Sequence, residues 1–169
     1  MATEVVLDTS YLLAWHRAND RLHPRAKKIQ ETLARAKPGR IVLDCVYSEL
    51  IAVLARTRVE EEGRVHEFLE EERKLRQIYW PRLVWMGYIG GSDLMGRALE
   101  VSREAAEKSG VGISPHDAML LVFCHDHRVP FLVSFDRVLG QVKTIEGREL
   151  EVLVVDDSNR EALLEPRPA

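Results

Sequence analysis

The sequence predicts an α/β sandwich built on a mostly parallel sheet of about five strands. Short apolar runs rich in β-branched residues alternate with longer segments of helical periodicity. Parallel strands need crossover connections, and alternating strands and helices supply them as right-handed βαβ units. The 169 residues suit one domain with a sizeable core. We therefore expect a single domain over residues 1–156 and a loosely held tail over 157–169.

The first half of the chain predicts two strands and four helices. Residues 3–8 form a short β-branched run that ends in an acid, and 40–44 form a second apolar run. Apolar residues at spacings of three and four predict helices, and Lys37-Pro38-Gly39 stops the second of them. The expected order is strand 3–8, helix 10–17, helix 22–36, strand 40–44, helix 47–58 and a charged helix at 60–76.

The second half predicts three further strands. Pro81 breaks the helical pattern, and Gly87 with Gly90-Gly91 marks a turn before a helix that Ser92 caps. Ser114-Pro115 is a typical helix start before a long apolar run, and Glu146-Gly147 indicates a hairpin-like turn. The expected order is strand 82–86, helix 92–109, a buried helix from 115, strand 131–133 and strand 150–155.

Composition narrows the class of protein. A formal net charge of −3 is too acidic for passive, charge-driven nucleic-acid binding, although residues 1–40 are basic. The only cysteines, Cys45 and Cys124, lie in apolar segments and build no disulfide framework. The sequence has no apolar run long enough to cross a membrane and no visible export signal. We expect a cytoplasmic protein without a membrane partner.

Four acids stand out by their position in the expected elements. Asp8 ends the first strand, Glu49 lies in the first turn of the helix after the second, Asp117 opens a helix, and Asp136 follows the fourth strand. Ligand sites of parallel α/β sheets lie beyond the carboxyl ends of the strands. Clustered carboxylates repel one another unless a cation sits among them, and oxygen ligands favour Mg²⁺ or Mn²⁺ over zinc.

These acids stand in sequences that resemble a known family. Val5-Val6-Leu7-Asp8-Thr9-Ser10, Ser48-Glu49-Leu50, Ser114-Pro115-His116-Asp117-Ala118 and Leu132-Val133-Ser134-Phe135-Asp136 resemble the successive acidic motifs of the PIN-domain nucleases. The likeness spans about residues 4–155 and is greatest to the toxin ribonucleases of VapBC toxin–antitoxin pairs. The interval between Glu49 and Asp117 is somewhat longer than in that family.

The resemblance implies a PIN-like three-layer α/β/α sandwich and a divalent-metal-dependent endoribonuclease. Asp8, Glu49, Asp117 and Asp136 match the family's acidic positions and would be its metal-binding residues. Asp8 and Asp117 would be the central metal ligands, Glu49 would bind directly or through water, and Asp136 would hold a second metal or its water. Hydrolysis of RNA at such a site leaves a 5′-phosphate. Ser10 and Ser134 fit roles in orienting a carboxylate or reaching a phosphate. The family also implies a homodimer and, for toxins, an antitoxin that fills the groove.

Several residues have an ordinary interpretation beside a functional one. Arg17, Arg21 and Arg25, with Lys27 and Lys28, fit either an RNA phosphate track or a solvated helix face. His116 suits a local structural role better than contact with substrate or proton transfer. The remaining candidates are Tyr79, Trp80, Trp85 and Tyr88, then Asp44, Asp93 and the possible soft-metal set Cys124-His125-Asp126-His127. For the aromatic residues of this list, contact in the core or in a dimer is favoured over base stacking. For the acids and the possible soft-metal set, structural roles are favoured.

Two other functions compete with the nuclease. Acid-phosphatase-like hydrolases also place an aspartate after the first strand, but they need a second Asp where this chain has Ser10. A non-catalytic PIN-like RNA-binding or scaffold module keeps the fold and loses acids, whereas this chain carries all four. The endoribonuclease is therefore the leading hypothesis and the binding module the alternative.

Overall fold

The computed structural model describes residues 3–84 and 94–165. In the first range, short strands precede helices that begin directly at the strand ends. In the second, two long helices come before the remaining strands. The first range contains β1 (Glu4–Leu7), α1 (Thr9–His16), α2 (His23–Ala36), β2 (Gly39–Leu43), α3 (Asp44–Ala55), the π-helix η1 (Arg56–Glu61), α4 (Val65–Tyr79), η2 (Trp80–Arg82) and β3 (Leu83–Val84). The second contains α5 (Leu94–Ser109), α6 (Pro115–Asp126), β4 (Phe131–Val133), η3 (Leu139–Gln141), β5 (Thr144–Ile145), β6 (Arg148–Glu149), β7 (Leu153–Val155) and η4 (Arg160–Leu164).

The main sheet has five strands in the order β3-β2-β1-β4-β7. Every recorded pairing in it is parallel, with Val5 opposite Arg40 on one side and Phe131 on the other. The order reverses at β1, because the chain moves outward to β2 and β3 and then returns to β4. The crevice beyond the carboxyl ends of β1 and β4 is therefore the expected ligand position of such a sheet. The predicted fold class is confirmed.

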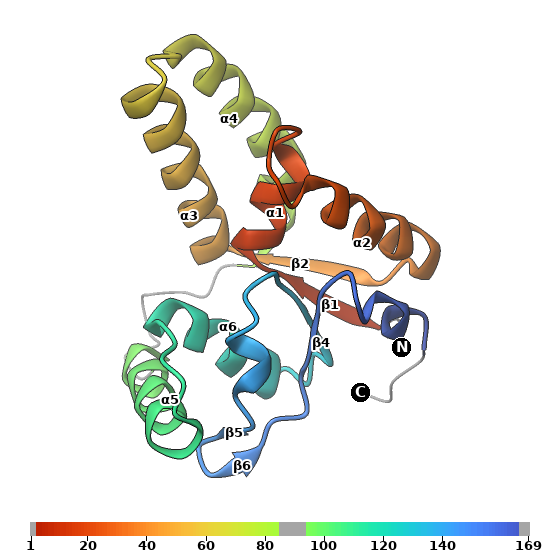
Figure 1. The fold of residues 1–169 in the computed structure, drawn as a ribbon, viewed down its shortest axis with the longest axis vertical. Helices are drawn as coiled ribbons and strands as arrows, with labels where there is room; N and C mark the ends of the chain where they lie inside the picture. Colours follow the sequence, from red (N-terminus) through yellow and green to blue (C-terminus); the bar gives the residue numbers. More distant parts are fainter. Residues whose placement is uncertain (1–2, 85–93, 166–169) are drawn as a thin grey trace.

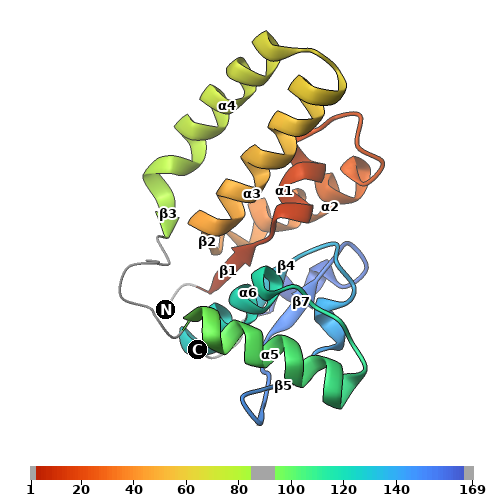
Figure 2. The same ribbon diagram turned by 90° about the vertical axis from the view of Figure 1, so that its left-hand side faces the viewer.

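The helices cover the sheet in two layers. Helices α1 to α4 lie on one side, and α5 and α6 lie on the other with the β5–β6 hairpin (Figures 1 and 2). The α3 and α4 helices project together away from the sheet (Figure 1). The molecule is thus a three-layer α/β/α sandwich with a helical projection formed by α3, η1 and α4.

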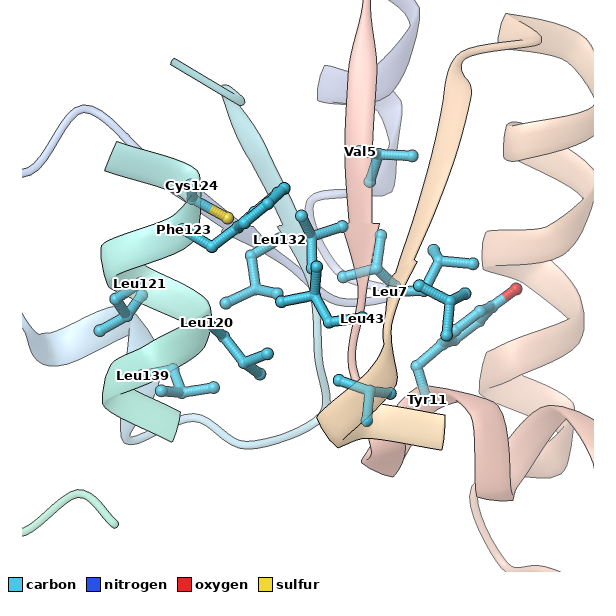
Figure 3. Close-up of a cluster of buried hydrophobic side chains, with 14 of the residues drawn as sticks. Val5, Leu7, Tyr11, Leu43, Leu120, Leu121, Phe123, Cys124, Leu132 and Leu139 are labelled. Carbon is cyan, nitrogen blue, oxygen red and sulfur yellow. The ribbon is translucent and has the colours of Figure 1, made fainter. Parts of the chain in front are cut away.

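The core lies between the sheet and these layers. Figure 3 shows Leu120 and Phe123 of α6 facing Leu132, while Leu7 and Tyr11 lie on the opposite side of the sheet. All five side chains are buried. Every residue of α6 from Ala118 to Cys124 is buried, so the middle of this helix is enclosed on all sides and sets the position of its N-terminal residues.

Several boundaries differ from the sequence prediction. The last strand is β7 (Leu153–Val155), whereas the prediction began it at residue 150. The predicted strand end Asp44 belongs to the first turn of α3, whose backbone turns helical immediately after Leu43. Glu49 therefore lies in the second turn of α3 and not in the first. Glu60 belongs to the π-helix, and Gly63, with φ +67°, separates it from α4, because a left-handed residue interrupts the helix there.

The C-terminal segment also differs from the expected loosely held tail. Residues 160–164 form η4, and Leu163 is buried in the core. Arg25 of α2 forms ion pairs with Asp156 and Asp157 just before this segment. These contacts hold the described part of the tail, through residue 165, against α2.

The remaining expectations are mixed. The β5–β6 hairpin turns at Glu146 and Gly147, as predicted, and both residues have positive φ. The predicted roles of Trp85, Tyr88, Gly90-Gly91, Ser92 and Asp93 lie outside the described residues. Within residues 3–84 and 94–165, no helix is long and apolar enough to cross a membrane.

Candidate active site

Asp8 stands where the two central strands end. Its backbone N–H donates to the carbonyl of Val133 at 3.0 Å, which continues the pairing of β1 with β4 by one residue. The same residue is the N-cap of α1, and its Oδ1 accepts from the Thr9 N–H at 2.6 Å. The carboxylate is thus held at the switch point of the sheet and at a helix N-terminus, which favours negative charge.

Two serines hold the other oxygen of Asp8. Ser10 and Ser134 donate to Oδ2 at 2.6 and 2.7 Å, and their hydroxyl oxygens lie 3.2 Å apart. Both serines also accept hydrogen bonds from the loop after β4. The Phe135 N–H donates to Ser10 at 3.0 Å, and the Asp136 N–H donates to Ser134 at 2.9 Å. The orientation of Asp8 is therefore tied to the conformation of that loop.

Burial dominates the electrostatics of Asp8. The residue is only 5% exposed, and this burial raises the pKa of its carboxyl. Hydrogen bonds from Ser10, Ser134 and Thr9 oppose the rise in pKa, whereas the charge of Asp117 adds to it. All three donors are neutral. The negative charge of Asp8 is therefore unmatched by the groups that hold it and lies close enough to Asp117 to feel its field.

Asp117 comes to this place as part of a helix start. Ser114 is the N-cap of α6, and its hydroxyl and backbone N–H both donate to Asp117 Oδ2, at 2.7 and 3.3 Å. The Asp117 N–H donates back to the Ser114 hydroxyl at 3.1 Å. This is a capping box, with Pro115 at the first helical position. The capping box gives Asp117 a structural role, and its part in a metal site stays a prediction.

Glu49 is the most exposed of the four acids, with a side chain 46% exposed. Its Oε2 accepts from the Thr9 hydroxyl at 2.7 Å and lies 3.1 Å from His116 Nδ1. The contact with His116 lowers the pKa of Glu49 against the opposing effect of burial. Hydrogen bonds to Cys45 and to Glu49 raise the pKa of His116 to about 10. At neutral pH the pair is an imidazolium–carboxylate ion pair.

Asp136 is engaged locally. Its Oδ1 accepts from the Val138 N–H at 2.8 Å, which closes a turn just before η3. The backbone N–H of Asp136 is the group that donates to Ser134. The structure therefore links Asp136 to the Asp8 network through its main chain, while its carboxylate supports the turn.

Arg25 has structural contacts that differ from its predicted role, whereas Arg17 and Arg21 are described by their exposure alone. Arg25 forms ion pairs with Asp156 and Asp157, and its guanidinium lies over the Phe135 ring at 5.1 Å. This arrangement differs from the predicted RNA track, because Arg25 fastens the tail and the loop after β4 to α2. Arg17 is half-buried, whereas Arg21, Lys27 and Lys28 are exposed.

The other candidates have structural surroundings. The Tyr79 hydroxyl lies 2.6 Å from His16 Nε2, and the Trp80 ring packs edge-on against Tyr47. Cys124 is buried, and burial raises the pKa of its thiol to about 12. Such a thiol is a poor zinc ligand because metals bind the thiolate.

Two residues of the site had no assigned part in the sequence analysis. Thr9 and Cys45 both contact the Glu49–His116 pair. Thr9 directly follows Asp8, and Cys45 lies four residues before Glu49 on one face of α3, which is a signal that helical spacing supplies.

The donor chemistry fits a hard divalent cation in part. Asp8 is a buried carboxylate with an unmatched charge beside a second carboxylate, and both offer oxygen ligands. Within the described residues, however, no group of three or more His, Cys, Asp or Glu side chains is gathered closely enough to hold an ion. The structure brings Asp8 and Asp117 together, holds Glu49 on His116 and folds Asp136 onto its own turn.

A parallel α/β/α sandwich with acids at its central switch point defines the class of protein, and sequence comparison gives the family. The PIN domain family model matches residues 5–145. The chain belongs to the PIN domain family.

Solved structures agree on the fold. The chain resembles VapC20 of Mycobacterium tuberculosis, a sarcin–ricin loop cleaving toxin, with a TM-score of 0.61 and 19% identity over 84% of this chain and 97% of that one. It also resembles VapBC2 of Rickettsia felis, solved with a DNA fragment from its promoter, with a TM-score of 0.54 and 18% identity over 89% of this chain and 99% of that one. Comparison with curated protein sequences gives no significant match.

Proposed function

We propose that the protein is a divalent-metal-dependent endoribonuclease that hydrolyses RNA phosphodiester bonds at the carboxyl ends of β1 and β4. The observation that carries the proposal is the buried Asp8 carboxylate, held by neutral donors next to Asp117. Membership of the PIN domain family and the likeness to VapC proteins support a nuclease. Asp8 and Asp117 would be the central ligands of Mg²⁺ or Mn²⁺, and Glu49 and Asp136 the two other acids of the site.

The chain's own residues prepare this site. Ser10 and Ser134 fix the Oδ2 oxygen of Asp8, and the capping box fixes Asp117. Pre-orientation of this kind lowers the cost of binding an ion. When bound, the ion would polarise the phosphate and activate water for attack. Arg17 and Arg21 remain candidates for contacts with the RNA backbone.

We extend the proposal to partners. VapC20 is a toxin, and the resemblance to VapBC toxin–antitoxin pairs implies a partner of the antitoxin kind that would cover the acidic site of this protein. A cationic side chain of such a partner would offset the charge of Asp8 and Asp117. The homodimer expected for the family remains a prediction.

One observation favours a second function. Glu49 and Asp136 are engaged by His116 and by a backbone N–H, so a module that binds RNA without cleaving it also fits. The two functions differ in whether Asp8 and Asp117 bind an ion.

The experiment is a calorimetric titration of Mn²⁺ into the purified protein. We expect binding in the wild type and a loss of at least about 100-fold in affinity for Asp8→Asn and Asp117→Asn, because each removes a charged ligand. Asp20→Asn is the matched control, because the Asp20 carboxylate caps the loop before α2 through the Leu22 N–H. Circular dichroism checks that each variant is folded. Absence of binding in the wild type, or equal binding in all four proteins, would place the binding module ahead.

A further inference from the structure

Thr9, Glu49 and His116 form a continuous bridge beside the two central acids. One oxygen, Glu49 Oε2, accepts from the Thr9 hydroxyl at 2.7 Å and contacts His116 Nδ1 at 3.1 Å. The three residues come from α1, α3 and α6. Because α1 and α3 cover one side of the sheet and α6 the other, the bridge joins the two helical layers at the sheet edge (Figures 1 and 2).

Each end of the bridge is adjacent in sequence to a proposed ligand. Thr9 follows Asp8 at the start of α1, and His116 precedes Asp117 in the first turn of α6. A shift of either end therefore moves the backbone that carries the neighbouring carboxylate. The two carboxylates next to its ends, Asp8 and Asp117, repel one another.

Both ends of the bridge contact buried residues of α3. Thr9 is buried, and its hydroxyl also lies 3.4 Å from the carbonyl oxygen of Val46 on α3. His116 is half-buried and contacts Cys45, which is buried one helical turn before Glu49. Both ends therefore rest on the same stretch of α3.

We infer that Glu49 and His116 are positioning residues, which set the separation of Asp8 and Asp117 through the Thr9–Glu49–His116 bridge. This inference rests on the proposed function. It makes Glu49 a link between the elements that carry the two central ligands, in place of a metal ligand that binds directly or through water. The contacts of Glu49 Oε2 with Thr9 and His116 support the inference, because they occupy this oxygen between the two elements that carry the ligands.

The test measures Mn²⁺ affinity by calorimetry on the full chain. We expect His116→Ala to weaken binding by about 10- to 100-fold, as removal of a group that orients ligands does. His116→Asn keeps a nitrogen near the position of Nδ1 and should restore most of the affinity. His125→Asn, in the last turn of the same helix, is the matched control and should bind as the wild type does. Thermal melts confirm that all variants are folded.

A double variant shows whether His116 acts through Glu49. If it does, Glu49→Ala combined with His116→Ala binds Mn²⁺ no more weakly than Glu49→Ala alone, because either change already breaks the bridge. Additive losses, or wild-type affinity in His116→Ala together with a large loss in Glu49→Gln, would overturn the inference and make Glu49 a direct ligand. Absence of Mn²⁺ binding in the wild type would instead overturn the proposed function itself.

Discussion

The two aspartates proposed as central ligands are held by serines in opposite surroundings. Ser134, which donates to Asp8, is 1% exposed in the core, whereas Ser114, which caps α6 with Asp117, is exposed. The hydrogen bonds have the same length, 2.7 Å. The difference lies in the solvent, because water can replace a lost donor at Asp117 but not at Asp8.

The same serine–aspartate hydrogen bond therefore has different effects in the two places. On the buried side, folding fixes the carboxylate and leaves its charge poorly solvated until a cation arrives. On the exposed side, the carboxylate stabilises a helix start whether or not a cation is present. We expect mutations on the two sides to differ in their effect on stability. Two predictions test that expectation, and a third tests the effect of burial at a residue outside the site.

The largest effect should come from the buried serine. Ser134→Ala removes a donor to Asp8 and an acceptor for the Asp136 N–H, both partly or fully buried. We expect a loss of about 3 kcal/mol in the free energy of unfolding, because buried groups are left unpaired. Ser114→Ala should cost about 1 kcal/mol, as a lost helix cap does. Urea denaturation of metal-free protein measures both, and equal losses would remove the contrast.

His16 isolates the effect of burial from any role at the site. Burial lowers the pKa of His16 to about 4, beside the Tyr79 hydroxyl. Between pH 6.5 and about 4 the unfolded chain binds a proton that the folded chain does not, so the fold loses stability as the pH falls. We expect about 2 kcal/mol of this loss to disappear in His16→Gln. Parallel pH profiles for the two proteins would contradict the prediction.

The smallest effect concerns the charge of Asp8 itself. Because burial raises the pKa of this carboxyl, the ionised form opposes folding at neutral pH in the absence of a cation. Asp8→Asn should therefore raise the free energy of unfolding by about 1 kcal/mol in the presence of EDTA. Asp117→Asn should lower it by about 0.5 kcal/mol, because a charge is lost at a helix N-terminus. Thermal or urea unfolding would show whether the two changes have opposite signs.

The sequence predicted the parts of the fold that depend on short-range pattern. Val5 to Leu7 and Phe131 to Val133 are apolar, β-branched or aromatic runs between turn residues, and both are buried strands. The secondary structure of Asp44 was harder to predict, because an acid after an apolar strand fits the end of the strand and the first turn of a helix equally well. The backbone turns at Leu43, which no periodicity reveals, and the position of Glu49 within α3 follows from that turn.

The sequence predicts some contacts of the candidate site through its strand topology, but it does not predict those that depend on side-chain geometry. The switch point between β1 and β4 brings Ser134 to Asp8, across 126 residues of chain, and the parallel topology predicted this meeting. The ion pairs of Arg25 with Asp156 and Asp157 and the contact of Glu49 with His116 depend instead on side-chain geometry between distant elements. Charge pattern alone assigned Arg25 to a solvated or RNA-binding face.

The projection formed by α3, η1 and α4 explains how the chain holds a long interval between Glu49 and Asp117 (Figure 1). The projection lies between β2 and β3 in the chain, and its residues extend away from the sheet. The pairing of β2 with β1 and β3 therefore does not depend on the length of the projection. We expect insertions or deletions at its tip, near Gly63, to leave the acids at the sheet edge in place, because the tip lies away from the sheet.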